Sequence, residues 1–173
     1  MRPALALCAL ALAACSRPAA APAPAAAAPP AAATVPADVL AALDAPWPSA
    51  GPDGRVPGEL ARSELPLARP GKWTLTITHD GRSETREICE NGEFPDFAPD
   101  PSCPNVILRR APSGFTVDWR CATATATARM FLRAQGDFAT AYTADTVLRT
   151  VATGGKVTVT PAHQEARRIG ECG

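Results

Sequence analysis

The chain has 173 residues, among them 19 prolines, and its 17 basic side chains balance 17 acidic ones. A chain of this length holds one ordinary domain, and the alanine- and proline-rich first third supplies no packed core. A net charge of zero creates no long-range field that would attract nucleic acid or an anionic membrane surface. We therefore expect one domain that is shorter than the chain, with no nucleic-acid partner.

The N-terminus has the pattern of a bacterial export signal. Arg2 supplies a positive charge, and an unbroken apolar run follows at 4–14. This run is too short for a membrane span, which needs roughly 20 residues. It ends in LAAC, the form of a lipobox, in which Cys15 is acylated after cleavage. We expect a lipoprotein signal peptide at 1–14 and a lipid on Cys15; the alternative is an ordinary signal peptide cut nearby. In bacterial sorting patterns an aspartate after the acylated cysteine indicates retention in the inner membrane. Ser16 stands at that position here, so by resemblance to these patterns we expect the protein on the outer membrane, facing the periplasm.

Two segments separate this signal from the domain. Residues 15–36 are expected to form the lipid anchor and a disordered Ala/Pro-rich linker, because prolines fix φ and alanines bury little surface. Residues 37–69 are expected to be weakly ordered, with a short helix at 37–44 entered through Pro36. Trp47 in this segment either docks on the domain or stays exposed.

From residue 70, short runs alternate apolar and polar residues, as in half-buried strands. Turn signals divide them into hairpins centred on Asp80-Gly81, Pro112–Gly114 and Gln135–Asp137, followed by the run KVTVT at 156–160. Pro161 is expected to end that last run, because proline cannot donate to a strand ladder. The predicted fold is all-β, an antiparallel up-and-down meander forming a small curled sheet or barrel over 70–173.

Four cysteines remain in the exported domain once Cys8 leaves with the signal and Cys15 is acylated. An even set in an oxidising compartment predicts two disulfides among Cys89, Cys103, Cys121 and Cys172. No two of them form the close C-x-x-C pair of a zinc site, so we expect no metal.

Four cysteines allow three connectivities. In a simple meander the end of the second strand lies beside the start of the third, so we expect Cys89 to pair with Cys103. Cys121 then pairs with Cys172, provided that Pro161 turns the last segment back as an eighth strand.

Other chemistry-bearing residues form no recognisable constellation. The histidines, His79 and His163, have no nucleophile motif beside them and are expected at the surface. The loop from Glu90 to Cys103 is acidic, but its spacing does not match a calcium loop. We expect no catalytic residue and no cofactor.

The motifs at the two ends of the domain carry a resemblance. PGKW at 70–73, the four cysteines and ARRIGEC at 166–172 resemble a family of exported bacterial proteins known as domain of unknown function 3617. The likeness covers about 70–172, although Thr74 stands where the family usually has an acidic residue. The resemblance implies no established activity, and its motif residues are Pro70, Gly71, Trp73, Arg167, Arg168, Ile169, Gly170 and Cys172.

The sequence favours an envelope lipoprotein that acts as a non-catalytic binding or structural module, in contact with the membrane through its lipid and with an envelope protein or peptidoglycan. One alternative is a carrier of a small hydrophobic ligand inside the curled sheet. A second, an enzyme, has no motif to support it. A carrier needs an open apolar cavity, so the carrier hypothesis fails if the interior is filled by Trp73, Phe115, Trp119, Met130 and Phe138.

Overall fold

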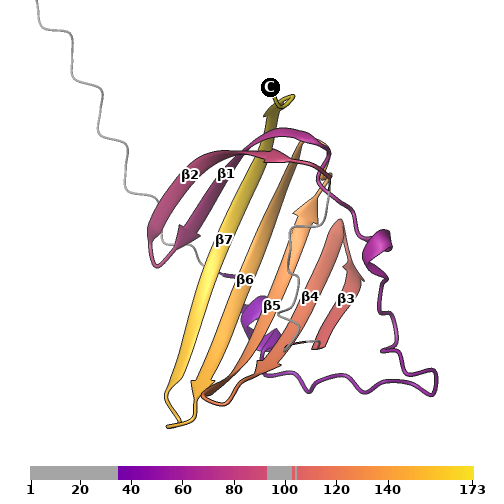
Figure 1. Ribbon diagram of the computed structural model, residues 1–173, viewed down its shortest axis with the longest axis vertical. Helices are drawn as coiled ribbons and strands as arrows, with labels where there is room; N and C mark the ends of the chain where they lie inside the picture. Colours follow the sequence, from indigo (N-terminus) through magenta and orange to yellow (C-terminus); the bar gives the residue numbers. More distant parts are fainter. Residues whose placement is uncertain (1–34, 93–102, 104) are drawn as a thin grey trace, which may run out of the picture.

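The computed structural model describes residues 35–92, 103 and 105–173 (Figure 1). Within these residues it has one short α-helix, one 3-10 turn and a sheet of seven strands. Their bounds are α1 Ala37–Ala42, η1 Arg62–Glu64, β1 Gly71–His79, β2 Arg82–Glu90, β3 Asn105–Ala111, β4 Gly114–Ala122, β5 Ala126–Gly136, β6 Ala141–Ala152 and β7 Val157–Gly170. None of the described helices is long and apolar enough to cross a membrane.

All neighbouring strands are antiparallel, in the order β2-β1-β7-β6-β5-β4-β3. Strands β3 to β7 form a meander, and the β1–β2 hairpin joins it along β7 and curls over one face (Figure 1). The predicted all-β antiparallel fold is confirmed. In the described residues the edge strands β2 and β3 do not pair with each other, so the sheet is curled and open rather than a closed barrel.

The expected break at Pro161 is wrong, because β7 continues through it to Gly170. Pro161 pairs with Val147 of β6, whereas β1 reaches only as far as His79, opposite Ala162. On the β1 side, therefore, β7 is an edge at Pro161. A proline is tolerated there because no neighbouring strand needs its missing N–H.

Alternation along the strands gives the sheet two faces. The face under the β1–β2 hairpin, called here the inner face, holds most of the core. One cluster lies over β3 to β6 and consists of Leu65, Leu108, Phe115, Val117, Leu132, Ala134, Phe138 and Ala144. A second, over β1 and β7, consists of Trp73, Leu75 and Ala166.

Helix α1 packs on the opposite, outer face. Val39 and Leu43 lie four residues apart and share one side of the helix, where they pack with Val35 against Val147. Phe131 of β5 extends this contact. A small apolar cluster therefore attaches the chain to the outer face before it reaches the sheet.

An ion pair between the buried Arg129 and the partly buried Asp118 fixes the end of α1 to the sheet. The guanidinium of Arg129 donates to both carboxylate oxygens of Asp118, at 3.0 and 2.7 Å. It also donates to the carbonyl oxygens of Leu43 at 2.8 Å and Ala45 at 2.6 Å. Arg129 thereby satisfies carbonyl groups at the helix C-terminus that have no partner within the helix.

The segment 37–69 has defined contacts where weak order was expected. Trp47 docks, with the guanidinium of Arg120 4.3 Å from its ring centroid. Further along the chain, the backbone amide of Leu60 donates to the carbonyl oxygen of Leu108 at 2.8 Å. The backbone amide of Arg69 donates to the carbonyl oxygen of Phe138 at 2.7 Å. These partners are distant in sequence, so local composition did not reveal them.

Candidate functional site

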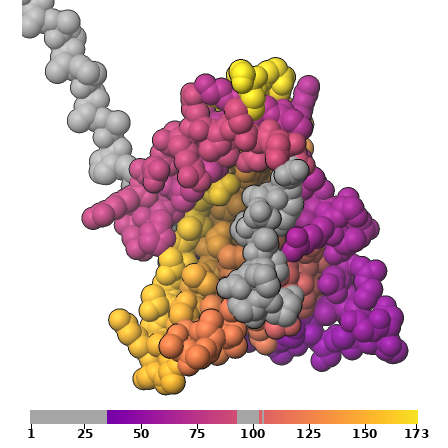
Figure 2. Space-filling view, viewed as in Figure 1, coloured from indigo at the N-terminus to yellow at the C-terminus, as the bar shows by residue number. Residues whose placement is uncertain are grey.

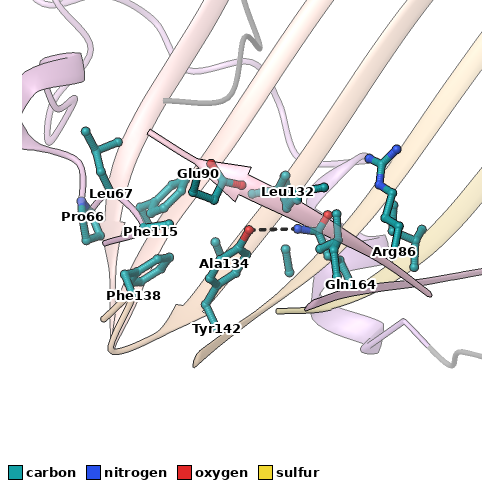
Figure 3. A pocket seen from close by; sticks show the side chains of 15 residues that line it. Pro66, Leu67, Arg86, Glu90, Phe115, Leu132, Ala134, Phe138, Tyr142 and Gln164 are labelled. Carbon is teal, nitrogen blue, oxygen red and sulfur yellow. Dashed lines mark hydrogen bonds between the residues drawn. The ribbon is translucent and has the colours of Figure 1, made fainter. Parts of the chain in front are cut away.

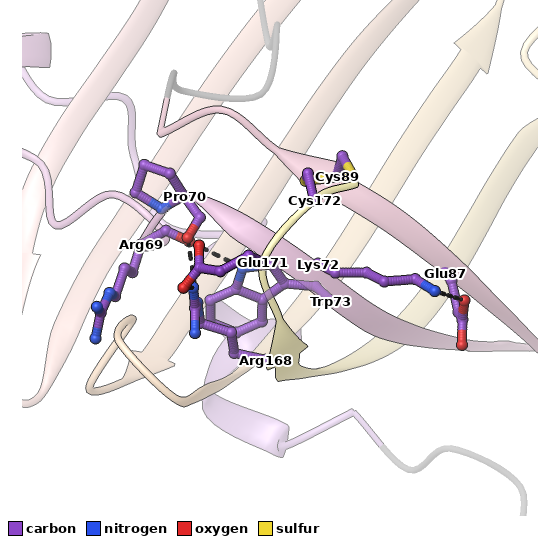
Figure 4. Close-up of a disulfide and its surroundings, with 9 residues drawn as sticks. All are labelled: Arg69, Pro70, Lys72, Trp73, Glu87, Cys89, Arg168, Glu171 and Cys172. Atoms are coloured by element: carbon purple, nitrogen blue, oxygen red, sulfur yellow. Dashed lines mark hydrogen bonds and ion pairs between the residues drawn. A yellow bond between two sulfur atoms is a disulfide. The ribbon is translucent and has the colours of Figure 1, made fainter.

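The residues of the two terminal motifs meet at one end of the sheet (Figure 4). Antiparallel pairing of β1 with β7 places Trp73 opposite Arg168 and Lys72 opposite Gly170. Trp73 is fully buried. Its indole N–H donates to the carbonyl oxygen of Arg69 at 2.9 Å.

Arg168 joins the two motifs. Its Nε donates to the carbonyl oxygen of Pro70 at 3.1 Å, and its Nη2 to Glu171 at 2.5 Å. This contact with Arg168 lowers the pKa of the Glu171 carboxyl. Arg167 is exposed and points to the outer face, as expected for adjacent residues on a strand.

Close backbone approach explains the glycine at the start of β1. Gly71 has φ +141°, and a Cβ placed on it would lie 2.5 Å from the carbonyl oxygen of Gly170. A larger residue would separate the two strands. Ile169, by contrast, is 46% exposed and adds little to this contact. The motif residues thus make a structural junction.

The expected disulfide pairing is wrong. Cys89 is bonded to Cys172, and Cys103 to Cys121, with Cα–Cα distances of 5.8 and 4.6 Å. The prediction assumed that β2 lies beside β3, but these are the two opposite edge strands. Because β7 runs straight to its end beside β1, Cys172 arrives next to the end of β2, and no eighth strand is needed.

A cavity of about 270 Å³ opens on the inner face, between the β1–β2 hairpin and strands β4 to β7. Figure 2 shows the surface hollowed beside that hairpin. The apolar lining of the cavity includes Leu75, Ile77, Ile88, Phe115, Leu132 and Phe138 (Figure 3). Trp73, Phe115 and Phe138 are buried but leave this space open, and Trp119 and Met130 do not line it. The five large side chains therefore do not fill the interior.

Three aromatic rings form a row on this face. The ring centroids of Phe115 and Phe138 are 5.7 Å apart, and those of Phe138 and Tyr142 are stacked at 5.4 Å. The ring of Tyr142 also contacts Trp73, at 5.6 Å. The row offers ring faces and edges along one side of the cavity.

Few of the described residues that line the cavity are polar, namely Arg86, Glu90, Tyr142 and Gln164. The amide Nε2 of Gln164 donates to the hydroxyl of Tyr142 at 3.2 Å (Figure 3). Burial raises the pKa of Tyr142, and the charge of Glu90 raises it further. Burial also raises the pKa of Glu90 itself. A mostly apolar space with a few placed polar groups is typical of small-molecule sites.

Sequence reasoning did not single out Tyr142 and Gln164. Tyr142 pairs with Ala166, and Gln164 with Ala144, so their place on the inner face depends on the register of β6 and β7. Ala144 and Ala166 are apolar and lie on the same face as Tyr142 and Gln164, so they could have indicated that this face is buried. Alanine is also common at exposed positions, however, and is therefore a weak indication of a core.

A second polar cluster lies under α1 on the outer face. Nδ1 of His163 is 2.7 Å from the buried carboxylate of Asp145, and Arg133 reaches Asp145 at 3.5 Å and also contacts Asp38 of α1. His163 was expected at the surface, but it is half-buried; His79 is exposed. Among the described residues no three His, Cys, Asp or Glu side chains gather as a metal site. This cluster attaches α1 to the sheet.

Two predicted features fall outside the described residues. These are the lipidation site Cys15 with its signal and its linker up to residue 34, and most of the acidic loop, at 93–102.

Comparison with family models gives a match over most of the sheet domain. The model of a family described as a protein of unknown function, DUF3617, matches residues 68–172. Neither the curated proteins nor the solved structures contain a match to this chain.

Proposed function

Because this chain belongs to the DUF3617 family of proteins of unknown function, we propose a function from its own structure: it is a non-catalytic binding module of the bacterial envelope that holds a small ligand with an apolar body. The ligand occupies the cavity on the inner face. The observation that carries this proposal is the open volume of about 270 Å³ beside buried aromatic side chains.

The size and lining of the cavity support a ligand over a filled core. Small-molecule pockets are typically about 300–1,000 Å³. This cavity, at about 270 Å³, lies just below that range and therefore suits a small ligand. Packed interiors leave few voids larger than a water molecule. An opening of this size on the concave face therefore favours the carrier hypothesis over a module that acts only through its outer surface.

The sequence supports the place of action. The apolar run at 4–14 and the lipobox ending at Cys15 favour export and acylation, and Ser16 favours the outer membrane. The Ala/Pro-rich linker that follows would hold the domain away from the lipid. In this proposal the module binds its ligand on the periplasmic side of the outer membrane.

A fluorescent probe tests the cavity directly. The exported full chain carrying Cys15→Ser, which cannot be acylated, is titrated with N-phenyl-1-naphthylamine, an apolar probe that brightens when it leaves water. We expect saturable binding of one probe per chain. Ala144→Leu should abolish it, because Ala144 is buried and lines the cavity, and the added atoms fill the space.

The matched control is Thr143→Leu. Thr143 is the neighbouring residue on β6, is exposed and points to the outer face, so binding should survive. Both variants are checked for thermal unfolding. Absence of saturable probe binding, or binding that Ala144→Leu leaves intact in a folded protein, would contradict the proposal. Native mass spectrometry of the chain purified from its host envelope should then show whether a protein co-purifies instead.

A further inference from the structure

Glu90 is an acidic group at the cavity that has no partner among the described residues. It is the last residue of β2, lines the cavity and is half-buried. Its carboxylate has neither a hydrogen bond nor an ion pair with another part of the described chain. Burying a charge without a partner is unfavourable, which agrees with the pKa of Glu90 being raised by burial. A ligand that brought a positive charge would remove this penalty.

The surroundings of Glu90 suit a cation. Its charge acts on Tyr142, whose hydroxyl already accepts a hydrogen bond from Gln164. Tyr142 begins the aromatic row that continues through Phe138 and Phe115, all of which line the cavity. Ring faces attract organic ammonium groups, and aromatic side chains beside a carboxylate are a common way to bind them.

Arg86, the basic residue among the described residues that line the cavity, lies at some distance from Glu90. Arg86 is on the same strand and the same face, four residues earlier, which separates the two by about 13 Å along an extended strand. Figure 3 shows the two side chains apart, with Glu90 beside the aromatic rings and Arg86 toward Gln164. Arg86 therefore does not neutralise Glu90. The cavity has an acidic, aromatic end, an apolar middle and a basic end.

We propose that the cavity binds a small organic cation, an amine or quaternary ammonium group on a short apolar body, with the ammonium group at Glu90 and the aromatic row. The inference rests on the proposed function and names the ligand class for the same cavity. Arg86 at the other end disfavours a second positive charge and so sets the orientation of the ligand.

Three probes with the same hexyl body test the charge preference. Hexyltrimethylammonium, hexanol and hexanesulfonate each compete with N-phenyl-1-naphthylamine for the full chain carrying Cys15→Ser. We expect the cation to displace the probe at a concentration about tenfold lower than hexanol, the size of a partly desolvated cation–π and charge contact. Hexanesulfonate should be weaker than hexanol.

Glu90→Gln should remove the preference, so that the cation and hexanol compete equally. Glu84→Gln is the matched control, because Glu84 lies on the same face of the same strand, undergoes the same charge change, is exposed and does not line the cavity. It should keep the tenfold preference. Thermal unfolding shows whether each variant is folded.

The outcomes separate this inference from the proposed function. If N-phenyl-1-naphthylamine binds but hexanol competes as well as the cation, the cavity is real and the ligand class is wrong. If a folded Glu90→Gln protein keeps the preference, the assignment to Glu90 is wrong. If N-phenyl-1-naphthylamine does not bind, the proposed function fails. The three-probe comparison on the otherwise unchanged chain needs no Glu90 variant, so it decides the ligand class even if Glu90→Gln does not fold.

Discussion

Removing the bond between Cys89 and Cys172 should cost about 4.5 kcal/mol of unfolding free energy. The two cysteines are 83 residues apart, and the chain-entropy relation for a loop of that length at 25 °C gives this value. Both residues are exposed, so their replacement by alanine removes little packing. The loss therefore reports almost entirely on the unfolded chain, which the bond constrains.

The assay is urea unfolding of the Cys89→Ala/Cys172→Ala protein beside the parent, followed by tryptophan fluorescence, to which the buried Trp73 contributes. Non-reducing peptide mapping of the parent first confirms which cysteines are joined. The comparison variant is Cys103→Ala/Cys121→Ala, whose loop of 18 residues gives about 3 kcal/mol by the same relation. Its buried cysteines add a packing loss.

Two results would refute this reasoning. A peptide joining Cys89 to Cys103 would show that β2 and β3 are neighbours and that the strand order is wrong. A loss below about 1 kcal/mol, with the bond to Cys172 present in the parent, would show that loop closure does not set its contribution.

Three further predictions concern stability. Arg129→Met leaves the carboxylate of Asp118, whose side chain is only 15% exposed, without its partner. Urea unfolding should therefore show a loss of about 3 kcal/mol, and hydrogen exchange in α1 should become faster. Asp137 accepts hydrogen bonds from Thr140 and from backbone amides that hold its pKa well below the usual range. Its contribution is therefore present above about pH 4 and lost at lower pH, so the parent and Asp137→Asn should differ in thermal stability at pH 7 and converge in strong acid. Because the pKa of Glu90 is raised rather than lowered, its effect on stability has the opposite pH dependence: the folded state holds the proton more tightly, and ionisation at higher pH destabilises it. Glu90→Gln should therefore match the parent in thermal stability at pH 3 and exceed it at pH 8. Equal pH profiles would contradict either assignment.

Local signals predicted the strands well. The Asp80-Gly81 turn joins β1 and β2 as expected, and both residues have positive φ, which glycine adopts freely and aspartate tolerates. The hairpin at 112–114 also forms where the turn residues place it. Features that depend on a few consecutive residues could therefore be read from the sequence.

Features that depend on the order of strands could not. Whether Pro161 ends a strand depends on where β1 stops, and the partner of Cys89 depends on which strands are the edges. Pairing β1 with β7 brings together segments about 90 residues apart, and alternation within each segment does not encode that choice. The cavity is still less predictable, because it arises from the curl of the β1–β2 hairpin over the inner face.

The bond between Cys89 and Cys172 makes a covalent ring of almost the whole sheet domain. Six of the seven strands begin or end within it. A protease that cuts the backbone once between these cysteines would open the ring without releasing a fragment, because both pieces remain joined through the disulfide. A molecule nicked in this way would keep its strands and its cavity together until a reductant separated the two pieces.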